Sequence, residues 1–235
     1  MTGVQTCALP IWQKNAVALT EEDFPVNPSY RAAVAATGAK ILFSSRWFNC
    51  TLVEASPAVR TSIEQLPVVS SVEFVAPGST ASGRTSRTAK TAVQSGYAIS
   101  INQLSLMGID VMHDDGYTGK GVTIAVMDSG FPGVNTLPAF STMSAENRIR
   151  DTYNYAYNRS DVYGFDSHGE NVLSILASKP VPNFSGSAPD ADYLLYVTEY
   201  VPTEYRIEEY NWLFAAERAD SAGADVINSS LGYFT

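Results

Sequence analysis

An aspartate follows one strongly apolar segment of this chain, and a histidine precedes another. Asp128 comes directly after the run IAVM, so an ionisable carboxylate stands where a buried segment gives way to a loop. An aspartate in that position is more often a turn or cap residue than a functional one. The histidine is His168, which precedes GENVLSILAS and can equally be a cap or a solvated loop residue. Their chemistry therefore depends on what the rest of the chain places beside them.

Histidine is the side chain that most readily exchanges protons near neutral pH, and the chain has two of them. His113 lies in MHDDGYTGKG, between acidic residues in a turn-rich segment, and we expect it to face solvent. Any histidine-dependent chemistry must use one of these two residues, which leaves His168 as the stronger candidate.

Short apolar runs in the C-terminal half predict the strands that position these residues. VTIAVM and YLLYV at 193–197 are continuous apolar runs, typical of parallel strands that are covered on both faces, and ADVINSS predicts a third strand. Helices are predicted between them, one starting at His168 and another running from a Thr203 cap to Gly223. Strands that alternate with helices indicate an α/β domain with a parallel sheet.

In an open parallel sheet, ligands gather at the carboxyl ends of the strands. Asp128 stands at the end of one predicted strand, and Ser230-Leu231-Gly232 follows another. His168 begins a predicted helix, whose N-terminus is a natural edge for a crevice. These three features can therefore converge on one face of the domain.

The first third of the chain predicts a smaller α+β unit. Helices are expected after Asn27-Pro28 and after Ser56-Pro57, because Asn or Ser caps each start and Pro suits the first helical position. AKILFS, RWFNCTLVEA and PVVSSVEFVAP are the predicted strands. The order helix, strand, strand, helix, strand is ferredoxin-like with its first strand missing.

Two further segments stand apart from both units. Residues 78–95 are rich in Gly, Ser and Thr without an apolar period, and we expect a linker that is open to proteolysis. Residues 1–12, MTGVQTCALPIW, resemble a translated sequencing adapter and are expected to be non-native. The two cysteines, Cys7 and Cys50, are too few for a disulfide framework or a Cys-based metal site.

Composition and missing motifs exclude several classes of function. A net charge of -9 argues against a nucleic-acid partner, and no apolar run reaches the roughly 20 residues that cross a membrane. GYTGKG departs from a P-loop, and Gly130 stands where an aspartyl-phosphate phosphatase needs a second Asp. Neither HExxH nor a four-ligand zinc set is found. The acidic segment EYRIEEY is interpreted as a solvated helix face.

Four segments taken together carry a family resemblance: GKGVTIAVMDSG, DSHGENVLSILAS, SGSAPDADYLLYVTEY and AERADSAGADVINSSLG. In this order and approximate spacing they resemble the subtilisin-like serine proteases, the peptidase S8 or subtilase family. Residues 20–77 resemble the family's N-terminal propeptide, through EEDFPVNPSY, SSRWFNCTLVEA and QLPVVSSVEFV. The fold class implied is a truncated subtilisin-like α/β parallel sheet with flanking helices, preceded by a small α+β ferredoxin-like propeptide.

The resemblance assigns roles residue by residue. Asp128 and His168 match the Asp and His of the family's Asp-His-Ser triad, in the family's chain order. His168 would take the proton of the nucleophilic hydroxyl and return it to the leaving amine, while Asp128 would hold the imidazole in the correct tautomer. Ser230, Leu231 and Gly232 match the strand on which the family pairs the backbone of its peptide substrate.

Other positions agree with the family's pattern or depart from it. Gly130 and Gly169 match positions where the family packs its backbone tightly. Glu170 stands where the family usually has Thr, which places a carboxylate beside the expected catalytic pocket. Tyr233 stands where a second Gly is common after SLG, and would alter the shape of the substrate pocket.

The family's oxyanion-hole Asn and its Gly-Thr-Ser nucleophile segment would come later than residue 235. GSTASG at 78–83 is rejected as that segment, because it lies in the linker ahead of Asp128 and precedes no helical pattern. We therefore expect this polypeptide to be an N-terminal fragment that does not hydrolyse peptides by itself, since it lacks both nucleophile and oxyanion stabilisation.

The resemblance thus implies a secreted or cell-envelope bacterial serine endopeptidase zymogen that acts on protein or peptide substrates. Residues 20–77 would be its intramolecular inhibitor, 78–95 its processing linker and 96–235 part of its catalytic domain. No cofactor is identifiable; calcium is implied by the family alone, with DVYGFD as a candidate segment. The alternatives are a catalytically dead pseudoprotease or peptide-binding module and, less favoured, a nucleotide-binding α/β domain, which would need a phosphate loop.

Overall fold

The computed structural model describes residues 20–77, 99–179, 185–203 and 205–232. The adapter-like segment 1–12 and the linker segment 78–95 lie outside these residues. Within the described ranges, no helix combines the length and the apolar character that a bilayer span requires.

The chain divides into two compact units, and each is described by itself. One unit comprises Met1–Gly83 and Tyr205–Ala222. The other comprises Arg84–Glu204 and Gly223–Thr235. The second unit contains the parallel sheet, so it also contains the residues for which chemistry is predicted.

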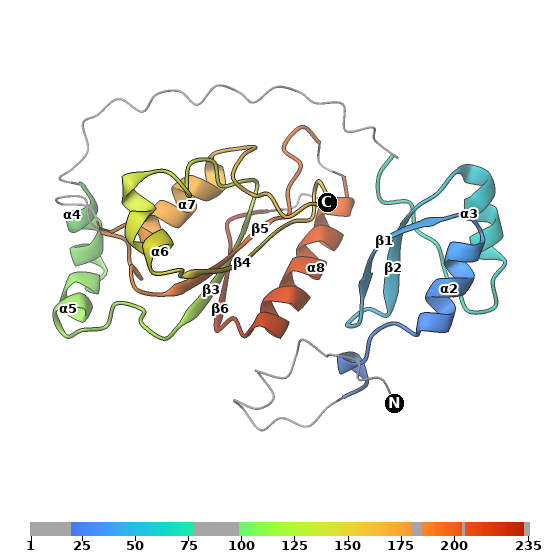
Figure 1. The fold of residues 1–235 in the computed structure, drawn as a ribbon, viewed down its shortest axis with the longest axis horizontal. Helices are drawn as coiled ribbons and strands as arrows, with labels where there is room; N and C mark the ends of the chain where they lie inside the picture. The colour runs from blue at the N-terminus through green and yellow to red at the C-terminus, as the bar shows by residue number, and fades with distance from the viewer. Residues whose placement is uncertain (1–19, 78–98, 180–184, 204, 233–235) are drawn as a thin grey trace. The chain divides into compact units, whose positions relative to one another are not determined.

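A four-stranded parallel sheet forms the centre of the second unit (Figure 1). Its strands are β3 (Thr123–Asp128), β4 (Ile149–Asn154), β5 (Asp192–Val197) and β6 (Val226–Ser229), in the order β4-β5-β3-β6. The three predicted strands are confirmed as β3, β5 and β6, of which β3 and β5 are buried and β6 is mostly exposed. β4 lies at an edge and is mostly half-buried, so it has no continuous apolar run to predict it.

The register of the sheet brings the carboxyl ends of its strands to one level. Asp128 on β3 lies opposite Val197 on β5, and Val197 lies opposite Asn154 on β4. On the other side of β3, Met127 lies opposite Ser229, the last residue of β6. Residues that follow these four strands therefore share one edge of the sheet.

The core of this unit surrounds the two central strands. Val126, Tyr193 and Leu195 are completely buried and pack with Phe131 and Leu173 from the segments that cover the sheet. Burial on both faces explains why β3 and β5 are apolar at successive positions. The last residue of β3, Asp128, is equally buried although it is ionisable.

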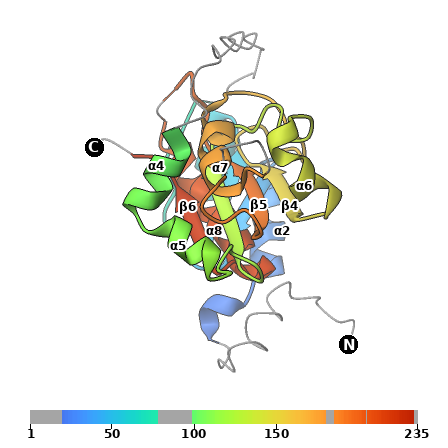
Figure 2. The same cartoon turned by 90° about the vertical axis from the view of Figure 1, so that its left-hand side faces the viewer.

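Among the described residues of this unit, four helices accompany the sheet: α4 (Ile99–Leu106), α5 (Ile109–Asp114), α6 (Ser141–Ala145) and α7 (His168–Ala177). The predicted helix starting at His168 is confirmed as α7, which packs against β3. α4 and α5 pack against each other (Figures 1 and 2), and neither was predicted from the sequence. A 3₁₀ turn, η2 (Pro138–Phe140), leads into α6.

The N-terminal residues of the first unit form two helices around a strand pair. Its elements are η1 (Glu21–Asp23), α2 (Pro28–Ala36), β1 (Lys40–Ser45), β2 (Cys50–Glu54) and α3 (Pro57–Glu64), with β1 and β2 antiparallel. The predicted caps are confirmed: Asn27 accepts a hydrogen bond from the Ser29 amide, and Ser56 accepts one from the Val59 amide.

The strand predicted for PVVSSVEFVAP is wrong, because residues 67–77 join no β-ladder. Val69 and Val72 from this segment instead pack against the small core of Val34, Ala39 and Ile63. The apolar alternation that predicted a strand therefore reflects packing on that core without pairing to β1 or β2. Only the helix–strand–strand–helix part of the predicted ferredoxin-like order is found in the described residues.

The first unit is completed by α8 (Ile207–Ala222), which Gly223 follows in a left-handed conformation (φ +87°). The predicted cap at Thr203 is wrong, because the helix begins at Ile207 and the Thr203 amide bonds to the Tyr200 carbonyl in a turn. The interpretation of EYRIEEY as a solvated face is also wrong in part: Glu208 is only 2% exposed, whereas Glu209 is half-buried beside the exposed Arg206.

Candidate active site

The structure brings Asp128 and His168 into direct contact, although they are 40 residues apart in the chain. Nδ1 of His168 lies 2.8 Å from Oδ1 and 3.0 Å from Oδ2 of Asp128. The Asp128 side chain is fully buried, whereas the His168 side chain is 53% exposed. A buried carboxylate thus holds one side of an imidazole ring that solvent can reach.

Groups at the end of β3 supply hydrogen bonds to the buried carboxylate of Asp128. Oδ1 of Asp128 accepts hydrogen bonds from the amide of Ser129 at 2.7 Å and from its hydroxyl at 3.1 Å. The carbonyl of Asp128 accepts from the amide of Thr198, which follows β5. A buried ionisable group persists when hydrogen bonds replace the water that it loses, and these donors together with His168 do so.

The start of α7 fixes the position of the imidazole. Oδ1 of Asp166 accepts a hydrogen bond from the backbone amide of His168 at 2.9 Å, and it lies 3.3 Å from the Ser129 hydroxyl, whose single proton it shares with Asp128. Asp166 therefore satisfies an N-terminal amide of the helix, since Ser167 at the cap position makes no side-chain cap bond. The same carboxylate connects the start of α7 to the end of β3.

Two glycines allow the loop and the helix to approach β3 this closely. A Cβ on Gly130 would lie 2.4 Å from the carbonyl oxygen of Gly164. A Cβ on Gly169 would lie 2.5 Å from the carbonyl oxygen of Gly130 and 2.8 Å from Cβ of Asp128. All three distances are shorter than real Cβ contacts. A side chain at Gly130 would displace the loop of Gly164 and Asp166, and one at Gly169 would push α7 away from Asp128.

Hydrogen bonding leaves the other ring nitrogen of His168 open. With Nδ1–H donating to Asp128, Nε2 carries the lone pair of the neutral ring. No side chain or backbone group in the described ranges bonds to this nitrogen. The arrangement can therefore accept a proton at Nε2 while the buried carboxylate balances the charge that develops on the ring.

Ser230, Leu231 and Gly232 extend directly beyond β6. Because Met127 pairs with Ser229, Ser230 is the next residue at the level of Asp128, on the side of β3 away from β5. Leu231 is half-buried, and Ser230 and Gly232 are exposed. This segment runs along the edge of the sheet at the level of the Asp128–His168 pair, with an exposed residue on either side of Leu231.

Glu170 occupies the first turn of α7, as the sequence places it. Its carboxylate lies beside Gly133, and partial burial raises its pKa above the usual range for glutamate. No described residue donates a hydrogen bond to it or forms an ion pair with it. The first turn of the helix therefore carries a partly desolvated carboxylate two residues after His168.

The prediction that His113 faces solvent is wrong. His113 lies on α5, is half-buried, and its Nε2 is 3.0 Å from the carbonyl oxygen of Ser187. The acidic neighbours in its sequence did not indicate this contact, which comes from a segment 74 residues away. His113 is therefore a structural residue remote in sequence from the Asp128–His168 pair.

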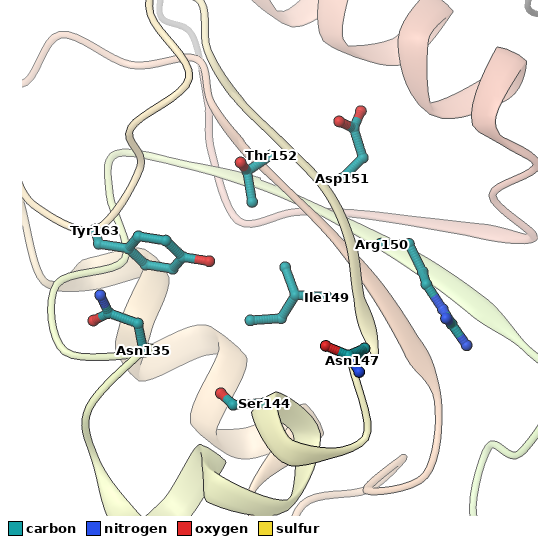
Figure 3. A pocket seen from close by; sticks show the side chains of 8 residues that line it. All are labelled: Asn135, Ser144, Asn147, Ile149, Arg150, Asp151, Thr152 and Tyr163. Carbon is teal, nitrogen blue, oxygen red and sulfur yellow. The ribbon is translucent and has the colours of Figure 1, made fainter.

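A separate cavity of about 510 Å³ lies beside β4 (Figure 3). Figure 3 shows the hydroxyl of Tyr163 and the side chain of Ile149 pointing toward its interior. Its lining residues are Asn135, Ser144, Asn147, Ile149, Arg150, Asp151, Thr152 and Tyr163. Neither Asp128 nor His168 is among them, so this cavity is distinct from the candidate catalytic pair.

DVYGFD, the candidate calcium segment, does not provide a set of free oxygen ligands. Asp161 accepts a hydrogen bond from the Tyr163 amide, and Asp166 is bonded to Ser129 and His168. In the ranges that the structure describes, no three His, Cys, Asp or Glu side chains gather as metal ligands would. The described residues of this segment therefore show no ligand cluster that would support a calcium site.

Ser129 and Asp166 secure the pair, and neither was assigned a role from the sequence. Their signal was present, because each stands next to a candidate: Ser129 follows Asp128, and Asp166 lies two residues before His168. A short polar side chain beside a candidate residue commonly bonds to a nearby backbone group. The sequence could not show that the Ser129 hydroxyl and the His168 amide both bond to the Asp166 carboxylate.

Two family models match the chain. The peptidase S8 propeptide domain of Bacteroidota matches residues 6–94, and the subtilase family matches residues 119–234. The matched segments follow one another in the order propeptide, then subtilase. Asp128, His168 and residues 230–232 all lie within the second match.

Individual proteins show the same similarity. An extracellular serine protease of Serratia marcescens is 30% identical over 132 residues, covering 55% of this chain and 11% of that protein. A second protein of that name and organism is 31% identical over 117 residues, covering 49% and 10%. This chain thus spans about a tenth of the length of these curated relatives.

Solved structures are similar as well. The MycP3 protease from the type VII (ESX-3) secretion system is 26% identical with a TM-score of 0.47, covering 59% of this chain and 38% of that one. MycP1 from Mycobacterium smegmatis is 22% identical with a TM-score of 0.42, covering 57% and 37%. Because two peptidase S8 models together match most of the sequence, this chain belongs to the peptidase S8, or subtilase, family, with an S8 propeptide domain ahead of its subtilase segment.

Proposed function

We propose that the whole protein is a serine-type endopeptidase and that Asp128 and His168 are two members of its Asp-His-Ser triad. The observation that carries the proposal is the contact between Nδ1 of His168 and the buried carboxylate of Asp128. Both residues lie in the segment that the subtilase model matches.

The geometry of the Asp128–His168 pair suits His168 to act as a general base. Nε2 of His168 accepts the proton of a nucleophilic hydroxyl as that oxygen attacks the carbonyl carbon of the scissile peptide bond. Asp128 stabilises the imidazolium that forms and keeps Nδ1 protonated throughout. His168 then returns the proton to the leaving amine, and a water molecule hydrolyses the acyl-enzyme by the same proton transfers.

In this proposal, a Gly-Thr-Ser segment later in the full-length protein than residues 119–234 supplies the nucleophile. The oxyanion-hole Asn also comes after these residues. Peptide substrate pairs its backbone with Ser230, Leu231 and Gly232, whose place level with Asp128 supports this role. The polypeptide of residues 1–235 alone then holds the base and its carboxylate without peptidase activity.

We further propose that the propeptide acts as an intramolecular inhibitor and is released by cleavage within residues 78–95. Support comes from the first compact unit, in which the propeptide hairpin contacts α8 of the subtilase segment. The carboxylate of Glu217 on α8 accepts hydrogen bonds from the Ser45 hydroxyl and from the amides of Arg46 and Trp47. Phe43 packs on Phe214 with ring centres 5.3 Å apart.

Secretion or attachment to the cell envelope of a bacterium is proposed with this function. The Serratia marcescens proteins are named extracellular proteases, and the matching propeptide domain is described for Bacteroidota. A propeptide that keeps a protease inactive until it has left the cell suits that location.

A fluorophosphonate probe tests the proposal on the full-length protein, because it labels an activated serine whatever the substrate preference. We expect labelling and peptide hydrolysis by wild type, and loss of both in Asp128→Asn, which removes the charge that orients His168. A folded full-length protein that binds peptides without labelling or cleavage would support the pseudoprotease alternative instead.

A further inference from the structure

Three aromatic rings and one guanidinium group contact one another in the loops that follow β4 and β5. Tyr157 and Phe165 lie with ring centres 4.5 Å apart at 25°, and Tyr200 meets Tyr157 edge-on at 5.4 Å. The guanidinium carbon of Arg159 lies 4.5 Å from the ring centre of Phe165 and 5.3 Å from that of Tyr157. We refer to these four residues as the aromatic–arginine cluster.

The cluster shares the edge of the sheet with the candidate catalytic pair. Asn154, Val197 and Asp128 end three neighbouring strands at one level, and Tyr157 and Tyr200 come shortly after the first two. Phe165 forms a β-bridge with Gly130, two residues after Asp128, and lies three residues before His168. The cluster therefore belongs to the same surface as the exposed imidazole.

Backbone strain at Phe165 accompanies this placement. Phe165 adopts a left-handed conformation with φ +74°, which is strained for a non-glycine residue. The Gly130 bridge on one side and the stacked ring of Tyr157 on the other hold it there. A bulky residue kept in this conformation beside an active site indicates that its ring orientation is used.

Arg159 presents a fixed positive charge to solvent at this place. Its backbone is held by paired hydrogen bonds with Asn154, at 2.8 and 3.0 Å, and the residue is exposed. The ring faces restrict the guanidinium further. Among the residues that the structure describes, no carboxylate forms an ion pair with it: neighbouring Asp161 bonds to the Tyr163 amide, and Asp166 bonds to Ser129 and His168.

We propose that Arg159 is a specificity-determining residue that binds the carboxylate of an acidic side chain near the scissile bond of the peptide substrate. A guanidinium that is already oriented loses little side-chain entropy on binding, and its planar fork matches a carboxylate. The stacked rings supply an apolar floor for the methylene groups of that side chain. This inference rests on the proposed endopeptidase function and names the substrate class of that same site.

The test compares peptides that differ only in Glu or Gln at one position, scanned over the positions on both sides of the scissile bond. The full-length protein cleaves them, and the ratio of kcat/KM for the Glu and Gln peptides is measured. At one position we expect wild type to favour Glu by about five-fold, the scale of a well-oriented ion pair at a surface. Arg159→Gln should bring that ratio to about 1.

Arg150→Gln is the matched control, because Arg150 is an exposed arginine on β4 that pairs with Asp192. It should keep the wild-type ratio. Wild type also gives a measure that needs no variant: raising NaCl from about 0.05 M to about 0.5 M should reduce the preference for Glu, because salt screens exposed charges. If Arg159 had only a structural role, Arg159→Gln would not change the ratio of kcat/KM for the Glu and Gln peptides. Salt would not change that ratio in wild type either.

The outcomes separate this inference from the proposed function. A protein that cleaves the peptides without a salt-sensitive preference for Glu at any position overturns the role of Arg159 and leaves the endopeptidase proposal standing. That role is overturned in the same way if Arg159→Gln keeps the wild-type ratio. A full-length protein that cleaves no peptide overturns the proposed function and this inference with it.

Discussion

Ser45 and Glu217 are joined by a buried hydrogen bond although they are 172 residues apart in the chain. Ser45 ends β1 and is fully buried, and Glu217 lies on α8 with 9% exposure. The same carboxylate accepts the amides of Arg46 at 3.1 Å and Trp47 at 3.3 Å. The Glu217 carboxylate of the subtilase segment thus accepts the hydrogen bonds of three donors at the turn of the propeptide hairpin.

Replacing Glu217 with Ala should destabilise the first unit by about 2–4 kcal/mol, because it leaves buried donors unpaired. Urea unfolding of the 1–235 chain, followed by circular dichroism, measures this loss. Glu209→Gln is the control on the same helix, since the Glu209 side chain is 42% exposed and its ion pair in the described residues is with Arg206 at 3.6 Å; it should change stability by less than about 0.5 kcal/mol. Equal effects of the two variants would contradict the importance of the hairpin contact.

Gly169→Ala should separate α7 from β3, because the new Cβ would overlap the Gly130 carbonyl and Cβ of Asp128. We expect a loss of about 2–4 kcal/mol in stability and, in the full-length protein, a loss of peptidase activity larger than the loss of folded protein. Gly164→Ala in the neighbouring loop meets no atom within 4 Å and should be tolerated. A fully active Gly169→Ala enzyme would show that the helix can move without disturbing His168.

The raised pKa of Glu170 predicts that the stability of the folded protein depends on pH. Its pKa is raised in the folded protein by burial, so above the unfolded value of about 4.3 the folded state binds more protons than the unfolded state. Stability is therefore lost as pH rises from that value through the folded pKa. Because Glu170 is largely solvated, the loss should be only a few tenths of a kcal/mol.

Glu170→Gln should accordingly unfold with a flatter dependence on pH between about 4 and 7, and should be at least as stable as wild type at pH 7. Thermal unfolding over that range measures the difference, with the exposed Glu22→Gln as control. A variant that loses stability specifically at neutral pH would show that ionised Glu170 is paired in the native state, contrary to its present surroundings.

The sequence predicted those parts of the fold whose local signals match their final environment. Asn27 and Ser56 begin helices because their side chains cap the backbone locally, and β3 and β5 are apolar because both of their faces are covered. The elements that were predicted wrongly or missed have local signals that differ from their final environment. Residues 67–77 alternate like a strand but pack without pairing, and β4 at the sheet edge has a mixed composition that hides it.

The candidate site shows the same division. Asp128 and His168 were identifiable from their settings and order, and the family resemblance linked them. Their contact, the shared carboxylate of Asp166 and the bond of His113 to Ser187 are long-range relationships, which local pattern does not encode. The aromatic–arginine cluster was likewise invisible, because its members come from separate loops that only the sheet brings together.

The chain's own two histidines provide the most direct test of the central claim, that His168 is the catalytic base held by Asp128. In the full-length protein, kcat/KM for peptide hydrolysis should fall by a factor on the order of 10⁴ or more in His168→Ala. His113→Gln should stay within about three-fold of wild type, because glutamine can still donate to the Ser187 carbonyl and His113 lies outside the triad. A His168→Ala enzyme that is folded and retains more than about a tenth of wild-type activity would contradict the account.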